Sequence, residues 1–286
     1  MNPTDNTEDI YLITQVQDGN KEALNILIRK YQDWIYNLVI RMVGDPEDAS
    51  DITQEVLIKV ITKLSTFRNE SSFRTWLYRI AANHVISMKK CRWERMFSSF
   101  EKHDRFRNNL KDSELNIPDN KPTDSAILVE ETRNACMTGM LLCLDRTKRL
   151  VFILDTVFGI DSKTGGKVLT IRADHYRKIL SRARKQLRYF MNEKCGLMNE
   201  KNPCRCALKT NAVIKTGVVN PDKVGNQSLK RIKDFVTEKR HVFENALEFK
   251  IKYLYRDHPL HASPDMEQVI GRILKNKTLN EIINFN

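Results

Sequence analysis

Apolar residues recur at helical spacing through most of this sequence, and that periodicity limits what the chain can fold into. Between Tyr11 and Val43 they lie three or four residues apart and break only at Gly19-Asn20, which predicts a short helix, a turn and a long amphipathic helix. Strictly alternating patterns are scarce, and only 10 Gly and 8 Pro occur among 286 residues. We therefore expect an all-α protein with more than one hydrophobic core.

The next helix is predicted to begin at Asp45-Pro46. Asp45 suits the capping position, Pro46 suits the first helical position, and acids are favourable near a helix N-terminus. From Asp45 to Glu55 the chain holds five acids and no base, beside an apolar face that continues to about Leu64. Such a surface suits docking to another protein, although solvation alone would also explain it.

The stretch from Ser71 to Arg95 predicts one long helix with a positive surface. Ser71 or Ser72 can cap it, and no Gly or Pro interrupts it. Six bases stand against one acid between Arg74 and Arg95, so the segment attracts phosphates. The aromatic residues Phe73, Trp76 and Tyr78 could stack on unpaired bases, but they would equally suit a core stripe beneath a solvated basic face.

The overall charge indicates a polyanionic partner. The chain carries 48 bases and 36 acids, a formal net charge of +12. Its apolar runs are far shorter than the roughly 18 to 20 residues that span a bilayer, and its acidic start does not resemble a signal peptide. We expect a cytoplasmic protein without membrane insertion, in which cysteines stay reduced.

Together these segments resemble region 2 of a bacterial RNA polymerase sigma factor of the extracytoplasmic-function (ECF) class. The resemblance rests on D-x-x-D-x-x-Q-E-V from Asp48 to Val56 and on F-R-x-E-S-S-F-R-T-W-L-Y-R-I-A-x-N from Phe67 to Asn83. It implies that the acidic helix docks on the largest subunits of core polymerase through Asp48, Asp51, Ile52, Gln54, Glu55, Leu57 and Ile58. It also implies that the basic helix reads and melts the −10 promoter element through Phe67, Arg68, Ser72, Arg74, Trp76, Tyr78, Arg79, Asn83, Lys89 and Lys90.

Helical periodicity resumes at Ser125 after a polar, Pro-broken stretch that we expect to be a linker. Two helices are expected next, separated by a break near Leu144-Asp145-Arg146. A short helix, a turn near Thr170 and a basic second helix then suggest a helix-turn-helix. The end of this segment resembles sigma region 4, which implies −35 contacts by Arg172, His175, Arg177, Lys178, Ser181, Arg182 and Arg184. Thr170 stands where the family's turn usually has glycine, and Gly165-Gly166 occupies a place where helix formers are usual.

About a hundred residues follow the segment that resembles region 4, whereas minimal sigma factors of this class end soon after it. These residues contain the cysteine cluster Cys195, Cys204 and Cys206. The three thiols could bind zinc with His241, His258 or His261 as a fourth ligand, could sense redox state, or could be structural. Ala207 to Asn226 is basic and turn-rich, and helices are expected from Ser228 to about Leu254 and from Pro264 to about Lys275. This extension could regulate promoter binding.

The sequence thus predicts region 2 in residues 1–96, a linker in 97–124, region 4 in 125–190 and a mostly helical extension in 191–286. Such a protein would bind core polymerase and promoter DNA, and an anti-sigma or other regulatory protein is a further candidate partner. Two alternatives are a stand-alone helix-turn-helix regulator and a metal or thiol sensor that acts without polymerase. The chain shows no phosphate loop, nucleophile elbow or paired-histidine zinc motif, so we do not expect an enzyme, and no cofactor is required apart from the zinc considered above.

Overall fold

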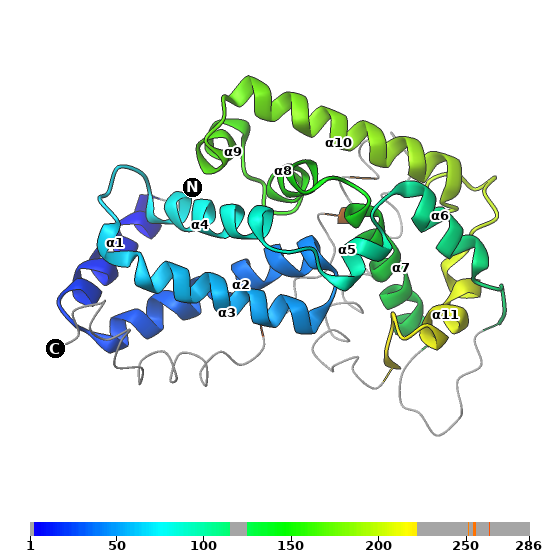
Figure 1. Cartoon of the computed structure of the whole chain (residues 1–286), viewed down its shortest axis with the longest axis horizontal. Coiled ribbons are helices and arrows are strands. Elements are labelled where there is room, and N and C mark those ends of the chain that lie inside the picture. Colours follow the sequence, from blue (N-terminus) through cyan, green and yellow to red (C-terminus); the bar gives the residue numbers. More distant parts are fainter. Residues whose placement is uncertain (1–2, 115–124, 222–250, 252–253, 256–262, 264–286) are drawn as a thin grey trace. The chain divides into compact units, whose positions relative to one another are not determined.

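The computed structural model describes residues 3–114, 125–221, 251, 254, 255 and 263. Within these ranges all regular structure is helical and no strand occurs, so the predicted all-α class is confirmed (Figure 1). None of the described helices combines the length and hydrophobicity needed to cross a membrane.

The chain divides into two units that are discontinuous in sequence. The described residues of the first are 3–89, 160–177 and 263, and those of the second are 90–114, 125–159, 178–221, 251, 254 and 255. This division does not follow the four segments expected from the sequence, whose boundaries stay a prediction.

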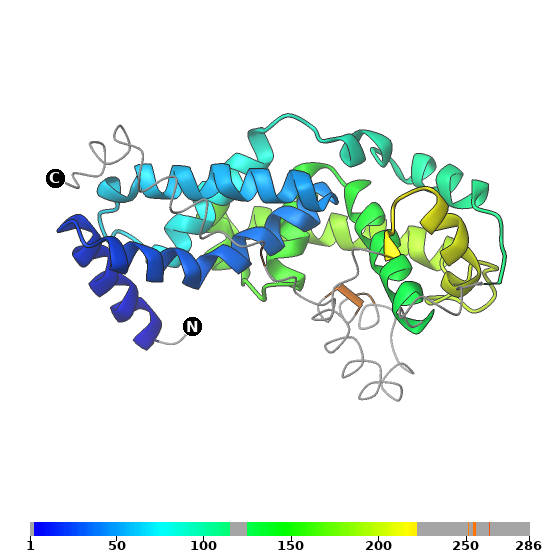
Figure 2. The same ribbon diagram turned by 90° about the horizontal axis from the view of Figure 1, so that it is seen from below.

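The first unit is a helical bundle with its core between α2 and α3, which lie side by side (Figure 2). Its core side chains include the fully buried Ile35, Leu38, Val39, Val56 and Phe73. Its elements are α1 (Pro3–Gln17), α2 (Lys21–Val43), α3 (Pro46–Thr62), the 3-10 helix η1 (Leu64–Thr66), α4 (Phe73–Ser87) and α9 (Ser162–Leu169).

Capping residues set the ends of these helices where the sequence predicts them. The Asn20 side chain accepts the backbone N–H groups of Glu22 and Ala23 at the start of α2. Gly44 ends α2 in the left-handed conformation at φ 82°, which glycine adopts without steric cost. Asp45 then caps α3, with Pro46 at its first position.

The predicted long helix from Ser71 to Arg95 is wrong in its second half. Helix α4 ends at Ser87, Met88 is extended, and a separate short helix, α5 (Arg92–Met96), follows. The Glu94 carboxylate accepts the backbone N–H of Cys91 at 3.1 Å and so caps α5 as a new helix. The six bases of this stretch therefore do not lie on one continuous helix.

The second unit contains α5, α6 (Phe100–Asn109), α7 (Ser125–Leu142), α8 (Arg146–Thr156), most of α10 (Ala173–Lys194) and α11 (Cys206–Lys215). Helices α7 and α11 pack together, and α10 begins within the first unit's residues. The apolar cluster beside α11 joins Leu110, Leu128, Val213 and Val219. The break between α7 and α8 lies where the sequence predicts it, with Asp145 capping α8.

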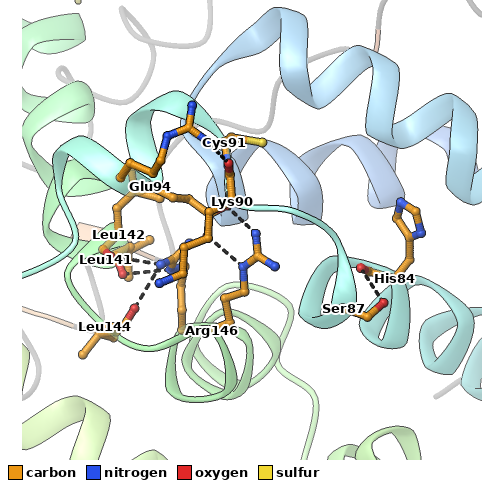
Figure 3. A network of polar contacts seen from close by, with 11 residues as sticks. His84, Ser87, Lys90, Cys91, Glu94, Leu141, Leu142, Leu144 and Arg146 are labelled. Atoms are coloured by element: carbon orange, nitrogen blue, oxygen red, sulfur yellow. Dashed lines mark hydrogen bonds and ion pairs between the residues drawn. The ribbon is translucent and has the colours of Figure 1, made fainter.

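A buried ionic network holds α5, α7 and α8 together in the second unit (Figure 3). Glu94 accepts hydrogen bonds from Arg146 and Arg149, and Arg149 also donates to the last carbonyls of α7 at Leu141 and Leu142. Burial alone would raise the pKa of Glu94, but the hydrogen bond from Arg146 and the charge of Arg149 outweigh it, so its pKa lies below the usual value.

Two segments differ from the expected linker and turn-rich stretch. Helix α6 lies within residues 97–124, where Ser99 caps it and His103 is buried. Helix α11 (Cys206–Lys215) occupies the first part of the stretch Ala207 to Asn226 that we expected to be turn-rich; it packs against α7, where Val213 joins an apolar cluster with Leu128. The helices expected at 228–254 and 264–275 fall almost wholly outside the described residues, as do His241, His258 and His261.

Candidate nucleic-acid interface

Helix α3 presents an acidic surface above an apolar core face. Asp51 and Glu55 are exposed, whereas Asp48, Gln54 and Ile58 are half-buried. The remaining two predicted docking residues, Ile52 and Leu57, are 8% and 1% exposed. Five of the seven predicted docking residues are therefore accessible to a partner, and two pack in the core.

Three aromatic residues meet where the Phe67–Ser72 loop enters α4. The ring of Phe67 lies 5.5 Å from those of Phe73 and Trp76, measured between centroids. Phe67 and Phe73 are buried, and Trp76 is half-buried at the edge of the cluster. The Ser72 side chain accepts the backbone N–H of Thr75 and caps α4. This cap fixes where the aromatic cluster and the helix begin.

Tyr78 points inward. It is 7% exposed and its ring stacks on that of Trp34 at a centroid distance of 3.6 Å, with 12° between the planes. Burial raises the pKa of Tyr78 to about 12, so the phenol stays protonated at neutral pH. Tyr78 therefore packs α4 against α2 through the Trp34 ring, and Trp76 is the aromatic residue of α4 that reaches the surface.

The basic and polar residues predicted for −10 DNA differ in exposure. Arg68, Asn83, Lys89 and Lys90 are exposed, and Arg74 and Arg79 are half-buried. The Arg79 guanidinium donates to the Lys167 carbonyl at 3.0 Å, where α9 packs against α4 in the first unit. Arg79 is therefore already engaged within the protein.

His84 links α3 to α4 and had no distinguishing signal in the sequence. Its Nδ1 lies 2.6 Å from the Lys59 ammonium, and its Nε2 lies 3.1 Å from the Glu55 carboxylate. Burial, followed by the Lys59 charge, lowers the pKa of His84. A neutral imidazole that accepts from Lys59 and faces Glu55 fits both distances, and it ties the acidic helix to the basic one.

The helix-turn-helix elements appear where the sequence predicts them, as α9, a turn at Thr170 and α10. Six of the predicted −35 residues are exposed: Arg172, His175, Arg177, Lys178, Ser181 and Arg182. Arg184 is half-buried and forms an ion pair with Asp155 at 2.6 Å. Arg172 pairs with Asp174, and Arg177 donates to the Ser162 hydroxyl.

Close packing explains why glycine stands at 165 and 166, where the family usually has helix-forming residues. A Cβ on Gly165 would lie 2.4 Å from the ring of the fully buried Tyr176, and a Cβ on Gly166 would lie 2.7 Å from the Ile171 carbonyl. Thr170 takes a left-handed conformation at φ 57°, the conformation for which the usual glycine is suited.

The predicted cysteine site is not arranged as a metal centre in the part of the chain that the structure describes. No group of three or more His, Cys, Asp or Glu side chains there is placed to hold a metal ion. Cys195, Cys204 and Cys206 are half-buried free thiols.

Comparison with known proteins matches the part of the chain that carries α3 and α4. Residues 27–95 match the family model Sigma-70 region 2. The RNA polymerase sigma-H factor of Pseudomonas aeruginosa is 46% identical over 76 residues, which are 27% of this chain and 39% of that protein. The ECF RNA polymerase sigma-E factors of Haemophilus influenzae and Escherichia coli K12 are each 44% identical over 75 residues, 26% of this chain and 39% of theirs.

The matched segment thus spans about two fifths of the length of these curated relatives. Within it lie both sequence motifs from which the resemblance to ECF sigma factors was inferred. That resemblance is confirmed for residues 27–95.

Proposed function

We propose that this chain is an ECF-class sigma factor that recruits core RNA polymerase to promoters, recognises their −35 and −10 elements and starts strand opening. One observation carries the proposal: within the segment that matches Sigma-70 region 2, an acidic helix and a basic, aromatic helix pack together and present different surfaces. The acidic surface suits a protein partner, and the basic one suits a separating DNA strand.

Core polymerase would bind the accessible ridge of α3. Asp51 and Glu55 supply charge, and Asp48, Gln54 and Ile58 supply polar and apolar contacts at its border. Ile52 and Leu57 act from within the core, where they hold the ridge in place.

The −10 element would be opened at the start of α4. Trp76, backed by the buried ring of Phe67, offers a stacking face for an unpaired base. Arg68, Arg74, Asn83, Lys89 and Lys90 would contact the strand, Ser72 would orient the helix start, and Arg79 would join them once released from α9.

The −35 element would be bound by the N-terminal part of α10. Its exposed Arg177, Lys178, Ser181 and Arg182 can reach base edges or phosphates, with Arg172 and His175 at the helix start. The chain would act in the cytoplasm and supply promoter selectivity, while the polymerase supplies catalysis.

Transcription in vitro with purified core polymerase and a promoter library tests the proposal. We expect selective initiation at promoters that share a −35/−10 pair. Asp51→Ala should weaken capture of core polymerase, whereas Asp18→Ala, an exposed acid outside the matched segment, should not. Specific duplex binding without core capture or selective initiation would instead identify a stand-alone DNA-binding regulator.

A further inference from the structure

Four cysteines, three of them close in sequence and one about sixty residues earlier, lie near one another in the second unit, and the proposed function uses none of them. Cys136 lies on α7, Cys195 follows α10, Cys204 precedes α11 by two residues and Cys206 is the first residue of α11. Cys136, Cys204 and Cys206 line one cavity of about 40 Å³, whose walls include Phe97, Phe106 and Leu110. A water-sized molecule needs roughly 10–15 Å³, so this cavity has room for a small reagent.

The loop between α10 and α11 is built to bring Cys195 and Cys204 together. A Cβ on Gly196 would lie 2.1 Å from the Cys204 carbonyl oxygen, so only glycine permits this approach of the two backbones. The Asn202 amide donates to the carbonyls of Asn192 and Cys195 and thereby joins the loop to the end of α10. Arg205 braces the other side by donating to the Glu200 carbonyl.

The thiols have different surroundings. The Arg107 guanidinium lies beside Cys204 and gives this thiol a cationic neighbour. Burial raises the pKa of Cys206 to about 12, and burial also raises the pKa of Cys195 and of Cys136. Cys204 is therefore the thiol that has both the Arg107 contact and a place on the cavity wall, beside three thiols whose burial disfavours the thiolate.

Geometry also distinguishes the partners available to Cys204. The backbone of Arg205 is extended, so at the usual strand rise the Cα atoms of Cys204 and Cys206 lie about 6.6 Å apart. That separation is near the upper limit of the Cα–Cα distances found in disulfides. Cys136 belongs to a different helix and lies 3.9 Å from the His103 Nε2. Cys195 is adjacent to the Gly196 backbone contact and is the nearest candidate on the same loop.

We propose that Cys204 is a peroxide-reactive thiol that forms a reversible disulfide with Cys195. The Cys204 thiolate attacks hydrogen peroxide, the O–O bond breaks, and sulfenic acid forms while the departing hydroxide takes a proton to become water. The Cys195 thiol then attacks that sulfur, the S–S bond forms, and a second water leaves with the thiol proton. Two thiols are oxidised, one peroxide is reduced, and a dithiol reductant reverses the change.

Peroxide treatment of the reduced full-length protein, followed by mass mapping, tests this inference. We expect a Cys195–Cys204 disulfide that forms at least about tenfold faster than oxidation of Cys91, a half-buried thiol outside the cluster. Cys195→Ser should stop the reaction at a Cys204 sulfenic acid that dimedone traps. Cys91→Ser should leave disulfide formation unchanged.

A second variant guards against misfolding caused by a cysteine change. Arg107→Gln removes the cationic neighbour of Cys204 and should slow the reaction about tenfold, while far-ultraviolet circular dichroism stays unchanged. A disulfide from Cys204 to another cysteine would overturn the proposal. Equal oxidation of all six thiols, or a stoichiometric zinc ion that protects the cluster from peroxide, would overturn it as well.

Discussion

Individual residues of α4 are divided between scaffold and surface. Trp76 and Tyr78 are two positions apart on a helix, so their side chains point in different directions. Their sequence context does not distinguish them, because both stand among bases and apolar residues. Only the Trp34 ring, from α2, shows which one is inside.

Trp76→Ala should therefore impair strand opening more than duplex binding. Stacking of one base on an aromatic ring is worth about 1–3 kcal/mol, and that contact forms only with an unpaired base. Permanganate footprinting reports opening, and a mobility-shift assay with polymerase holoenzyme reports binding. Tyr78→Phe keeps the ring stacked on Trp34 and should change neither, so an opening defect there would contradict the assignment.

Thr170 is the residue whose backbone is least suited to its side chain. A β-branched residue at φ 57° costs about 1–2 kcal/mol relative to glycine. Thr170→Gly should raise the free energy of unfolding by about 1 kcal/mol, measured in urea. Gly159→Ala is the opposite test, since Gly159 has φ +65° and open space around it, and it should lower stability by a similar amount.

Elements whose ends are fixed by nearby residues could be predicted, and those fixed by distant ones could not. Asn20, Gly44 and Asp45 cap helix ends that lie beside them in the sequence. The limits of α2 and the start of α3 could therefore be predicted from the sequence. The start of α5 depends on Glu94, whose arginine partners come more than fifty residues later. Helix α11 likewise depends on α7, which no local pattern reveals.

Glu94→Gln tests how strongly α5, α7 and α8 depend on one carboxylate. It leaves Arg149 buried without its charge partner, so the free energy of unfolding should fall by about 3 kcal/mol at pH 7. Because the folded pKa of Glu94 lies below its unfolded value of 4.5, its contribution is present above that pH and is lost as pH falls through the folded pKa. The difference from the unchanged protein should shrink there. The exposed Glu101→Gln is the control, and an equal loss would contradict the prediction.

The exposed bases of α10 should behave as phosphate contacts. Lys178→Ala and Arg182→Ala should each weaken binding to −35 DNA and reduce the salt dependence of the affinity by about one unit of slope. Fluorescence anisotropy over a salt series measures both. Lys185→Ala removes an exposed base further along the helix, and an identical change there would indicate a diffuse electrostatic effect.

At the scale of the whole molecule, the residues after α10 complete the second unit. Val213 and Val219 cover Leu110 and Leu128, and the Tyr255 hydroxyl donates to the Met137 carbonyl. The sequence predicted a mostly helical extension here, and the convergence of its cysteines with Cys136 had no signal in their spacing. What the sequence does carry are the limits of α2, the start of α3 and the turn at Thr170.

A chain ending at Phe190 should therefore be less stable than one ending at Pro221. Burying each valine contributes about 1.5–3 kcal/mol, so the shorter chain should lose at least about 3 kcal/mol of unfolding free energy in urea. Both truncations lack the same later residues, which isolates the contribution of 191–221. Equal midpoints and slopes would show that the two segments fold independently.

The close contact between Gly165 and Tyr176 limits how α10 can be exchanged among related proteins. If this chain's α10 were placed alone in a relative that carries alanine or a larger residue at the position of Gly165, the ring of Tyr176 would meet an occupied space. Designers of orthogonal gene circuits should move α9, the Thr170 turn and α10 as one cassette. The cassette, rather than α10 alone, is the interchangeable part of this protein.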